Sequence, residues 1–196
     1  MTPSPRDAGV ATPGTVAMRR AVPDDVAALT SLIERSVAEL SAGYYTPEQI
    51  VSATRYVFGV DTQLIADGSY YVMEQHGVLV GAGGWSRRRT LFGGDQMKST
   101  ADGRDTLLDP RVSPARIRAF FVHPQWARRG LARLLFEECE RAAARHGFRA
   151  FELVATLPGE PLYAALGFIV EERFDVDLPD GVTLPVCRMS RAIASP

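Results

Sequence analysis

The residues that could do chemistry first appear between positions 117 and 133, where the sequence reads IRAFFVHPQWARRGLAR. A short apolar run ends at His123-Pro124, and a helix is predicted to begin near Gly130. A helix start exposes unpaired backbone N–H groups and carries a partial positive charge. Glycine lets a ligand approach the backbone closely, and Arg128, Arg129 and Arg133 add positive charge. The stretch favours a diphosphate site, although many ordinary helices also begin with Gly and Arg.

A second candidate is Tyr163 in PLYAALGF, which lies 33 residues after Gly130. We expect it on a short helix that follows the next strand. Two parallel strands, each followed by a helix, place both helix starts on the same side of a sheet. Tyr163 could then stand near the end of a bound ligand and donate a proton to it. The alternative is an interfacial tyrosine that packs Leu162, Leu166 and Phe168 into the core.

The elements that would position these residues are predicted in the order β-α-α-β-β-β-α-β-α-β-β, with a short helical piece after the second helix. Strands are expected over residues 15–22, 70–75, 78–85, 116–122, 148–156, 168–178 and 182–189. Helices are expected over residues 23–40, 46–57, 61–66, 130–146 and 160–166. Hairpins combined with crossover helices indicate an α/β (α+β) fold. Its centre would be a mixed, mostly antiparallel sheet of about 6–7 strands with helices on both faces.

The overall composition indicates one globular domain. The chain has 196 residues, of which 46% are hydrophobic and 23% charged, and its formal net charge is -1. This balance argues against a general nucleic-acid or anionic-membrane binder. We expect residues 1–14, rich in Pro, Gly, Ser and Thr, to form a flexible tail, and residues 15–196 to form a single domain.

Two cysteines, Cys139 and Cys187, stand far apart, and no CxxC or Cys/His cluster is present. We therefore expect two unpaired thiols in a reducing cytoplasm and no metal site. No apolar run is long enough to span a membrane, and the N-terminus lacks the apolar stretch of a signal peptide.

A long loop and three aromatic residues could shape a pocket for a second substrate. Residues 93–115 are rich in turn formers and charge, and a loop of this length is usually functional or mobile. A lid and a solvated insertion without a chemical role are both open. Tyr44, Tyr45 and Trp85 are candidate pocket walls, with ordinary core packing as the favoured alternative.

Two motifs in this order and spacing resemble those of the GNAT superfamily of N-acetyltransferases. They are FFVHPQWARRGLARLLFEECE, at residues 120–140, and LYAALGF, at residues 162–168. The predicted order of elements also fits, so the resemblance extends from about residue 16 to residue 189. It is specific to the superfamily and not to any one substrate.

The resemblance implies acetyl-CoA as co-substrate and assigns roles to single residues. The residues implied to bind acetyl-CoA lie at two strand ends and at the helix start: Phe121, Val122, Arg128, Arg129, Gly130, Leu131, Ala132, Arg133 and Thr156. Backbone groups of Val122 would pair with the pantetheine arm, and Tyr163 would protonate the departing thiolate. Two positions depart from the family pattern. Ala127 stands where Gln or Arg is usual, and Thr156 stands where Asn is frequent, so the resemblance does not imply the usual side-chain contact at either position.

The general base is harder to place. Many family members carry a glutamate on the fourth strand, where this chain has Arg116 and Arg118. Glu152 on the neighbouring strand is the candidate base that we adopt, with Glu74 and His123 as weaker ones. A structural role for Glu152, with water relaying the proton, is the alternative.

We therefore predict an N-acetyltransferase that moves an acetyl group from acetyl-CoA to a neutral primary amine of a small molecule. A protein or peptide acetyltransferase and a non-catalytic acyl-CoA sensor are the alternatives. We expect no nucleic-acid or membrane partner and a cytoplasmic location. A homodimer is compatible with the sequence, which does not determine the oligomeric state or the acceptor amine.

Overall fold

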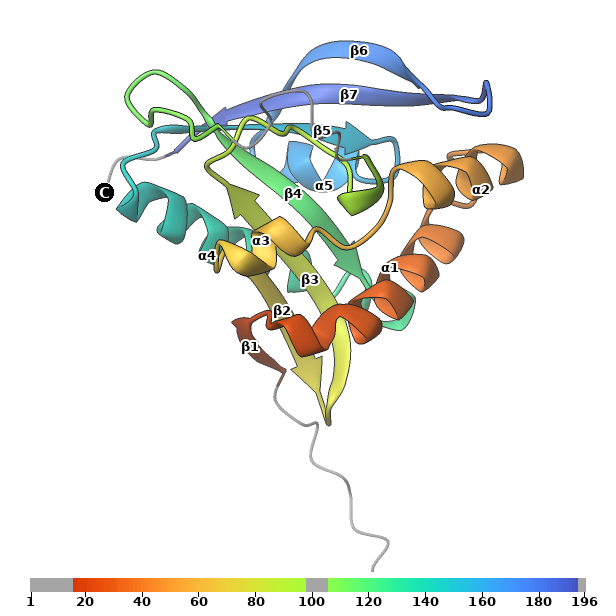
Figure 1. The fold of residues 1–196 in the computed structure, drawn as a ribbon, viewed down its shortest axis with the longest axis horizontal. Helices are drawn as coiled ribbons and strands as arrows, with labels where there is room; N and C mark the ends of the chain where they lie inside the picture. Colours follow the sequence, from red (N-terminus) through yellow and green to blue (C-terminus); the bar gives the residue numbers. More distant parts are fainter. Residues whose placement is uncertain (1–15, 98–105, 194–196) are drawn as a thin grey trace, which may run out of the picture.

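The computed structural model describes residues 16–97 and 106–193, so the predicted tail lies outside the described residues. Within these ranges the strands form one seven-stranded sheet in the order β1-β2-β3-β4-β5-β7-β6 (Figure 1). The strands are β1 (Ala17–Arg20), β2 (Tyr70–Gln75), β3 (Val78–Ser86), β4 (Ala115–Val122), β5 (Ala150–Thr156), β6 (Ile169–Asp177) and β7 (Thr183–Ala192). All neighbours are antiparallel except β4 and β5, which are parallel. The predicted mixed, mostly antiparallel sheet is confirmed.

Helices cover both faces of this sheet. They are α1 (Val26–Leu40), α2 (Pro47–Tyr56), α3 (Thr62–Ala66), α4 (Leu131–Arg145) and α5 (Glu160–Ala165). Short 3-10 helices occur at η1 (Pro23–Asp25), η2 (Asp95–Met97) and η3 (Pro124–Trp126). In Figure 1, α1 and α3 lie in front of the sheet, whereas α4 and α5 lie behind it. The predicted loop at residues 93–115 therefore contains η2, and its residues 98–105 lie outside the described part of the chain.

Apolar periodicity explains how the helices pack. On α4, Leu135, Phe136 and Cys139 are buried at helical spacing in the core behind the sheet. On α1, Leu29 and Ile33 do the same in front of it. Cys139 and Cys187 are both buried and free, as expected.

A third core cluster joins α2 to the β6–β7 hairpin. Ala53, Leu184 and Val186 are buried in it. Helix α2 begins with a capping box, because the Thr46 hydroxyl accepts the Gln49 backbone N–H at 3.2 Å and the side-chain Oε1 of Gln49 accepts the Thr46 N–H at 3.0 Å. The hairpin is thus held over the end of the sheet where β4 and β5 finish.

Candidate active site

The site begins where two parallel strands separate. Strands β4 and β5 pair only at Ala115↔Phe151 and Arg116↔Glu152. Beyond these pairs, β4 continues beside β3, and β5 continues beside β7 as far as Thr156↔Val186. The remaining length of β4 therefore has an edge open toward β5, as an extended amide-bearing ligand requires.

A β-bulge interrupts β4 inside this open region. Ala82 pairs with Phe121 and Gly84 with Arg118, so two β4 residues lie opposite Gly83. One of them, Ala119, has a φ of 54°, which is uncommon for a residue other than glycine. The other, Phe120, packs so close to Gly83 that a Cβ added there would meet its ring at 2.8 Å. A glycine opposite the bulge thus makes room for the Phe120 ring.

The end of β4 presents backbone groups to the opening. The His123 N–H donates to the Val80 carbonyl at 3.0 Å, which ties His123 to β3. Neighbouring peptide groups of a strand point to opposite sides. The N–H and C=O of Val122 therefore face away from β3, toward the gap between β4 and β5. This is the orientation that pairing with a pantetheine arm needs.

The start of α4 has the geometry of an anion-binding turn. Gly130 is the N-cap residue with a φ of 84°, and it provides no side-chain cap. The N–H groups of the first helical turn, from Leu131 to Arg133, thus have no partner within the helix. Arg128 has a φ of 63°, so left-handed residues flank Arg129 in a turn of the kind that gathers N–H groups. Arg129 itself lies over the Trp126 ring, with its guanidinium carbon 4.9 Å from the ring centroid.

Tyr163 lies on α5, facing the opening from behind the sheet. Its ring packs edge-on against Phe168, at 5.6 Å between centroids, and Phe120, at 6.3 Å. Burial raises the pKa of its hydroxyl above the ordinary tyrosine value. The side chain therefore packs in the core and also borders a cavity between β4 and β5, while its role as proton donor stays a prediction.

A cavity of about 230 Å³ passes through the gap between β4 and β5. Phe121, Val122, Thr156 and Tyr163 all line it, so the structure brings these predicted site residues together. The residues from Arg128 to Arg133 do not line it; they follow Val122 along the chain, on the short turn that leads into α4. Tyr44, Tyr45 and Trp85 do not line it either.

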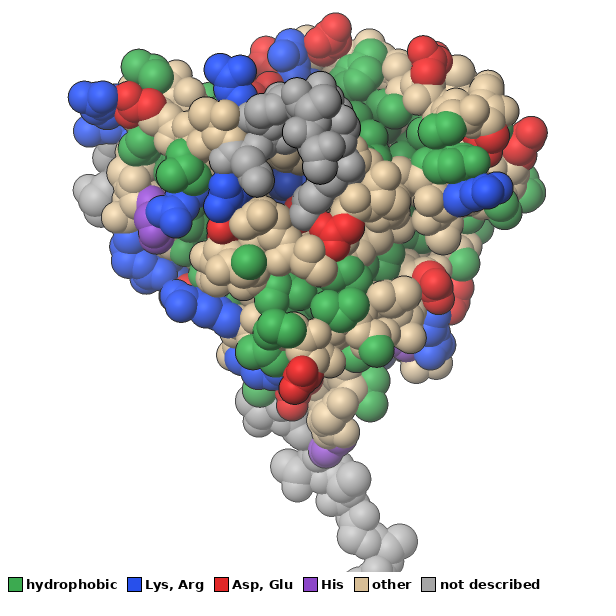
Figure 2. All heavy atoms as spheres, viewed as in Figure 1, with side chains coloured by type: hydrophobic (Ala, Val, Ile, Leu, Met, Phe, Trp, Pro, Cys, Tyr) green, Lys and Arg blue, Asp and Glu red, His purple; other side chains and the backbone are tan. Residues whose placement is uncertain are grey.

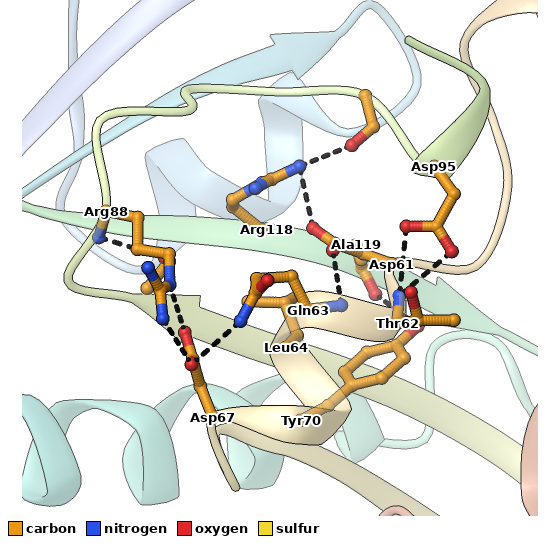
Figure 3. Close-up of polar contacts among 12 residues, drawn as sticks. Asp61, Thr62, Gln63, Leu64, Asp67, Tyr70, Arg88, Asp95, Arg118 and Ala119 are labelled. Carbon is orange, nitrogen blue, oxygen red and sulfur yellow. Dashed lines mark hydrogen bonds and ion pairs between the residues drawn. The ribbon is translucent and has the colours of Figure 1, made fainter. Parts of the chain in front are cut away.

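A buried ion pair that the sequence did not reveal borders this cavity in front of the sheet. An Arg118 guanidinium nitrogen lies 2.8 Å from an Asp61 carboxylate oxygen, and their side chains are 3% and 0% exposed. Arg118 also donates to the Gly93 carbonyl, and Figure 3 shows Arg118 pointing from β4 toward Asp61. Burial lowers the pKa of Arg118, while Asp61 opposes this shift. Asp61 also caps α3 by accepting the Gln63 N–H at 3.1 Å.

The candidate bases lie elsewhere. Glu152 forms an ion pair with Arg116 and lies 3.6 Å from Arg188, bordering a separate cavity of about 550 Å³. Glu74 accepts a hydrogen bond from Arg19 at 3.0 Å. His123 accepts the Gln125 N–H at its Nδ1 at 3.3 Å, which shapes the exit from β4. Among the described residues that line the Tyr163 cavity, none is Asp, Glu or His.

The described residues also bear on two other kinds of site. They contain no group of three or more His, Cys, Asp or Glu side chains that could hold a metal ion. None of the helices in these ranges is long and apolar enough to cross a membrane.

Comparison with known proteins points to one family. The model of the acetyltransferase (GNAT) family matches residues 35–168. No curated protein sequence matches the chain.

Solved structures share the fold at low sequence identity. A GCN5-related N-acetyltransferase from Rhodopseudomonas palustris is 21% identical, with a TM-score of 0.65 over 94% of this chain and 99% of that one. PaiA N-acetyltransferase from Thermoplasma acidophilum, solved with coenzyme A, is 15% identical, with a TM-score of 0.62 over 91% and 99% of the two chains. YncA from Salmonella typhimurium, solved with its cofactor acetyl-CoA, is 20% identical, with a TM-score of 0.57 over 93% and 96%.

Proposed function

Since the chain belongs to the acetyltransferase (GNAT) family, we propose that it transfers an acetyl group from acetyl-CoA to the primary amine of a small molecule. The observation that carries this proposal is the cavity between β4 and β5, where Tyr163 and the open edge at Val122 meet. An acetyl donor entering from behind the sheet and an acceptor entering from the front would meet at this point.

The described residues fit coenzyme A. The open edge of β4 supplies the C=O of Val122 to an amide N–H of a pantetheine arm and leaves the Val122 N–H for the thioester carbonyl. The turn into α4 supplies unpaired N–H groups and arginines to a diphosphate. Because this turn directly follows Val122 and η3, one extended ligand can contact both. Ala127 adds only a small side chain, so the diphosphate contacts would come mainly from the backbone.

The proposed chemistry is direct transfer. The amine nitrogen attacks the thioester carbonyl, and the Val122 N–H helps to hold the developing oxyanion. The C–S bond breaks as the N–C bond forms, and Tyr163 gives its proton to the departing sulfur. Its raised pKa keeps Tyr163 protonated at neutral pH, as a proton donor requires. Holding both reactants at attack distance contributes much of the acceleration.

The amine loses its proton by a route that avoids Glu152. Glu152 stays a candidate from the sequence, but its carboxylate is occupied by Arg116 and Arg188 and borders another cavity. We favour entry of an amine that is already neutral. After attack its nitrogen releases one proton to water, and Tyr163 takes up one from water to replace the proton given to sulfur.

Three chain segments in front of the sheet wall the acceptor side: α1, residues 57–59 and residues 91–94. This enclosure supports a small acceptor over an extended peptide. Thiol release from acetyl-CoA, measured across a panel of small amines and peptides, tests the proposal. Release that depends on a small amine is the expected result, with the acetylated amine as product. Binding of acetyl-CoA without release for any acceptor would favour the sensor, and release with peptides alone would favour the peptide enzyme.

A further inference from the structure

The acceptor half of the cavity is lined mainly by apolar side chains, with the hydroxyls of Ser36 and Ser41 and the guanidinium of Arg118 among them. We define it as the lining contributed by α1, residues 57–59, residues 91–94, Arg118 of β4 and the ends of β5, β6 and β7. Aliphatic and aromatic side chains dominate it, among them Val37, Leu40, Phe58, Val176, Leu184 and Val186. Figure 2 shows hydrophobic side chains also gathered on the outer surface over α2 and the β6–β7 hairpin. A ligand that fills this half would gain mainly from burying apolar surface.

The charge of this half is already balanced within the protein. Arg118 is the one charged side chain among the described residues that line the cavity. Asp61 lies 2.8 Å from it, and the Gly93 carbonyl accepts a further hydrogen bond. Asp61 is fully buried behind Arg118 and does not line the cavity. No described carboxylate therefore faces a bound ligand, and a second ammonium group would be buried without a counterion beside an arginine.

We infer that the acceptor is a primary amine on an apolar body, without a second cationic group, and that it reacts after entering in its neutral form. This inference rests on the proposed acetyl transfer. It also explains how the reaction proceeds with no acidic side chain or histidine among the described lining residues. Desolvation favours the neutral form of a bound amine, and no carboxylate in the described lining opposes it. Arg118 and Tyr163 are the titratable side chains in the described lining that face it.

A matched pair of amines tests the substrate class. Pentylamine and 1,5-diaminopentane have the same chain length and differ by one terminal ammonium group. We expect kcat/KM to be at least about tenfold higher for pentylamine, because the diamine must bury an unpaired charge. A preference for the diamine would overturn the inference and leave acetyl transfer standing. If neither these nor other small amines are acetylated while acetyl-CoA binds, the proposed function fails and the inference fails with it.

The pH dependence of kcat/KM tests entry in the neutral form. Benzylamine is a weaker base than pentylamine, so its neutral fraction saturates at a lower pH. We expect the rising limb of each profile to follow the ionisation of that amine. A limb at the same pH for both amines would indicate a titrating group of the enzyme and would overturn neutral entry.

A change in the cavity wall should reverse the selectivity. Ser36 is a buried residue of α1 that lines the acceptor half. Relative to the neutral variant Ser36→Asn, Ser36→Asp should raise the kcat/KM ratio of diamine to pentylamine by about tenfold, because its carboxylate provides the missing counterion. An unchanged ratio in a folded Ser36→Asp variant would contradict the inference. Should this variant not fold, the two comparisons on the unaltered protein still decide it.

Discussion

The two halves of the cavity are formed by different kinds of groups: mainly backbone groups in one and side chains in the other. The half behind the sheet, with the turn into α4, uses the backbone edge at Val122, the N–H groups after Gly130 and one hydroxyl, that of Tyr163. The half in front uses side chains from α1, two loops and three strand ends, and its single charged group is neutralised by Asp61. Backbone groups recognise one invariant ligand whatever the neighbouring side chains are. Side chains can change without disturbing those groups, so the front half is where acceptor specificity can vary.

The largest effect is expected from the single hydroxyl of the rear half. Tyr163→Phe should lower kcat by at least about 100-fold, the range for a general acid, and leave the affinity for acetyl-CoA nearly unchanged. The ring contacts with Phe168 and Phe120 are retained, so thermal stability should change little. Steady-state thiol release and equilibrium binding of acetyl-CoA measure the two quantities. Unchanged turnover would remove Tyr163 from the mechanism and leave only its packing role.

The rear half could be predicted from the sequence because its signals are local. Gly130, the arginines around it and the strand before them are contiguous, and Tyr163 stands in a short motif of its own. Element order then sufficed to bring the two together. The sequence does not show where β4 separates from β5, since strand pairing depends on contacts distant in the sequence.

The front half could not be predicted because its residues meet only in the folded chain. Arg118 was noticed as a departure from a family pattern, but nothing near it in the sequence identifies Asp61 as its partner. The aromatic residues considered as walls lie elsewhere. Tyr45 bridges two segments, donating to the Pro185 carbonyl at 2.7 Å and accepting the Leu157 N–H at 2.9 Å. Trp85 packs against Phe148 behind the sheet.

The second largest effect is expected from the Arg118–Asp61 ion pair of the front half. Asp61→Asn keeps an acceptor for the α3 cap but leaves the charge of Arg118 buried without its nearest counterion. We expect the free energy of unfolding to fall by about 3 kcal/mol, as for other buried pairs that lose one partner. Denaturant titration measures the loss, and KM for the acceptor should rise more than KM for acetyl-CoA.

Two further variants make the test of this ion pair specific. Glu39→Gln removes one partner of the exposed Arg35–Glu39 pair on α1, at 4.0 Å, and should change stability by less than about 0.5 kcal/mol. Combining Asp61→Leu with Arg118→Met should recover much of the stability, because no unpaired charge then stays buried. A similar loss for Asp61→Asn and Glu39→Gln would show that the buried pair contributes nothing beyond surface electrostatics.

A smaller effect is expected at Gly130 in the rear half. Comparing it with Gly181 distinguishes the cost of backbone strain from the loss of ligand contacts. Gly130 and Gly181 both have a φ of 84°, and a Cβ at either would meet no atom within 4 Å. Gly130→Ala and Gly181→Ala should therefore each lower the free energy of unfolding by about 1 kcal/mol through backbone strain alone. Only Gly130→Ala should also weaken acetyl-CoA binding, by about tenfold, because it disturbs N–H groups aimed at a charged ligand. Equal affinity in both variants would argue against a diphosphate at the start of α4.

The smallest effect concerns the hydrogen bond between Ser52 and Asp180, a clamp that holds one wall of the front half. Ser52 of α2 is buried and donates to the Asp180 carboxylate at 2.8 Å, which ties α2 to the turn between β6 and β7. Ser52→Ala should lower the free energy of unfolding by about 1 kcal/mol. It should also raise KM for the acceptor, since Leu184 and Val186 of that hairpin line the cavity.

The neighbouring Thr54 provides the control for this clamp, because its hydroxyl bonds only within α2, to the Ile50 carbonyl at 2.7 Å. Thr54→Ala should leave both KM values unchanged, as should Ser52→Ala for acetyl-CoA. If Ser52→Ala raises KM for acetyl-CoA as much as KM for the amine, the two halves do not respond independently. The cavity would then have a backbone half and a side-chain half in structure, but the two halves would not bind acetyl-CoA and the amine independently.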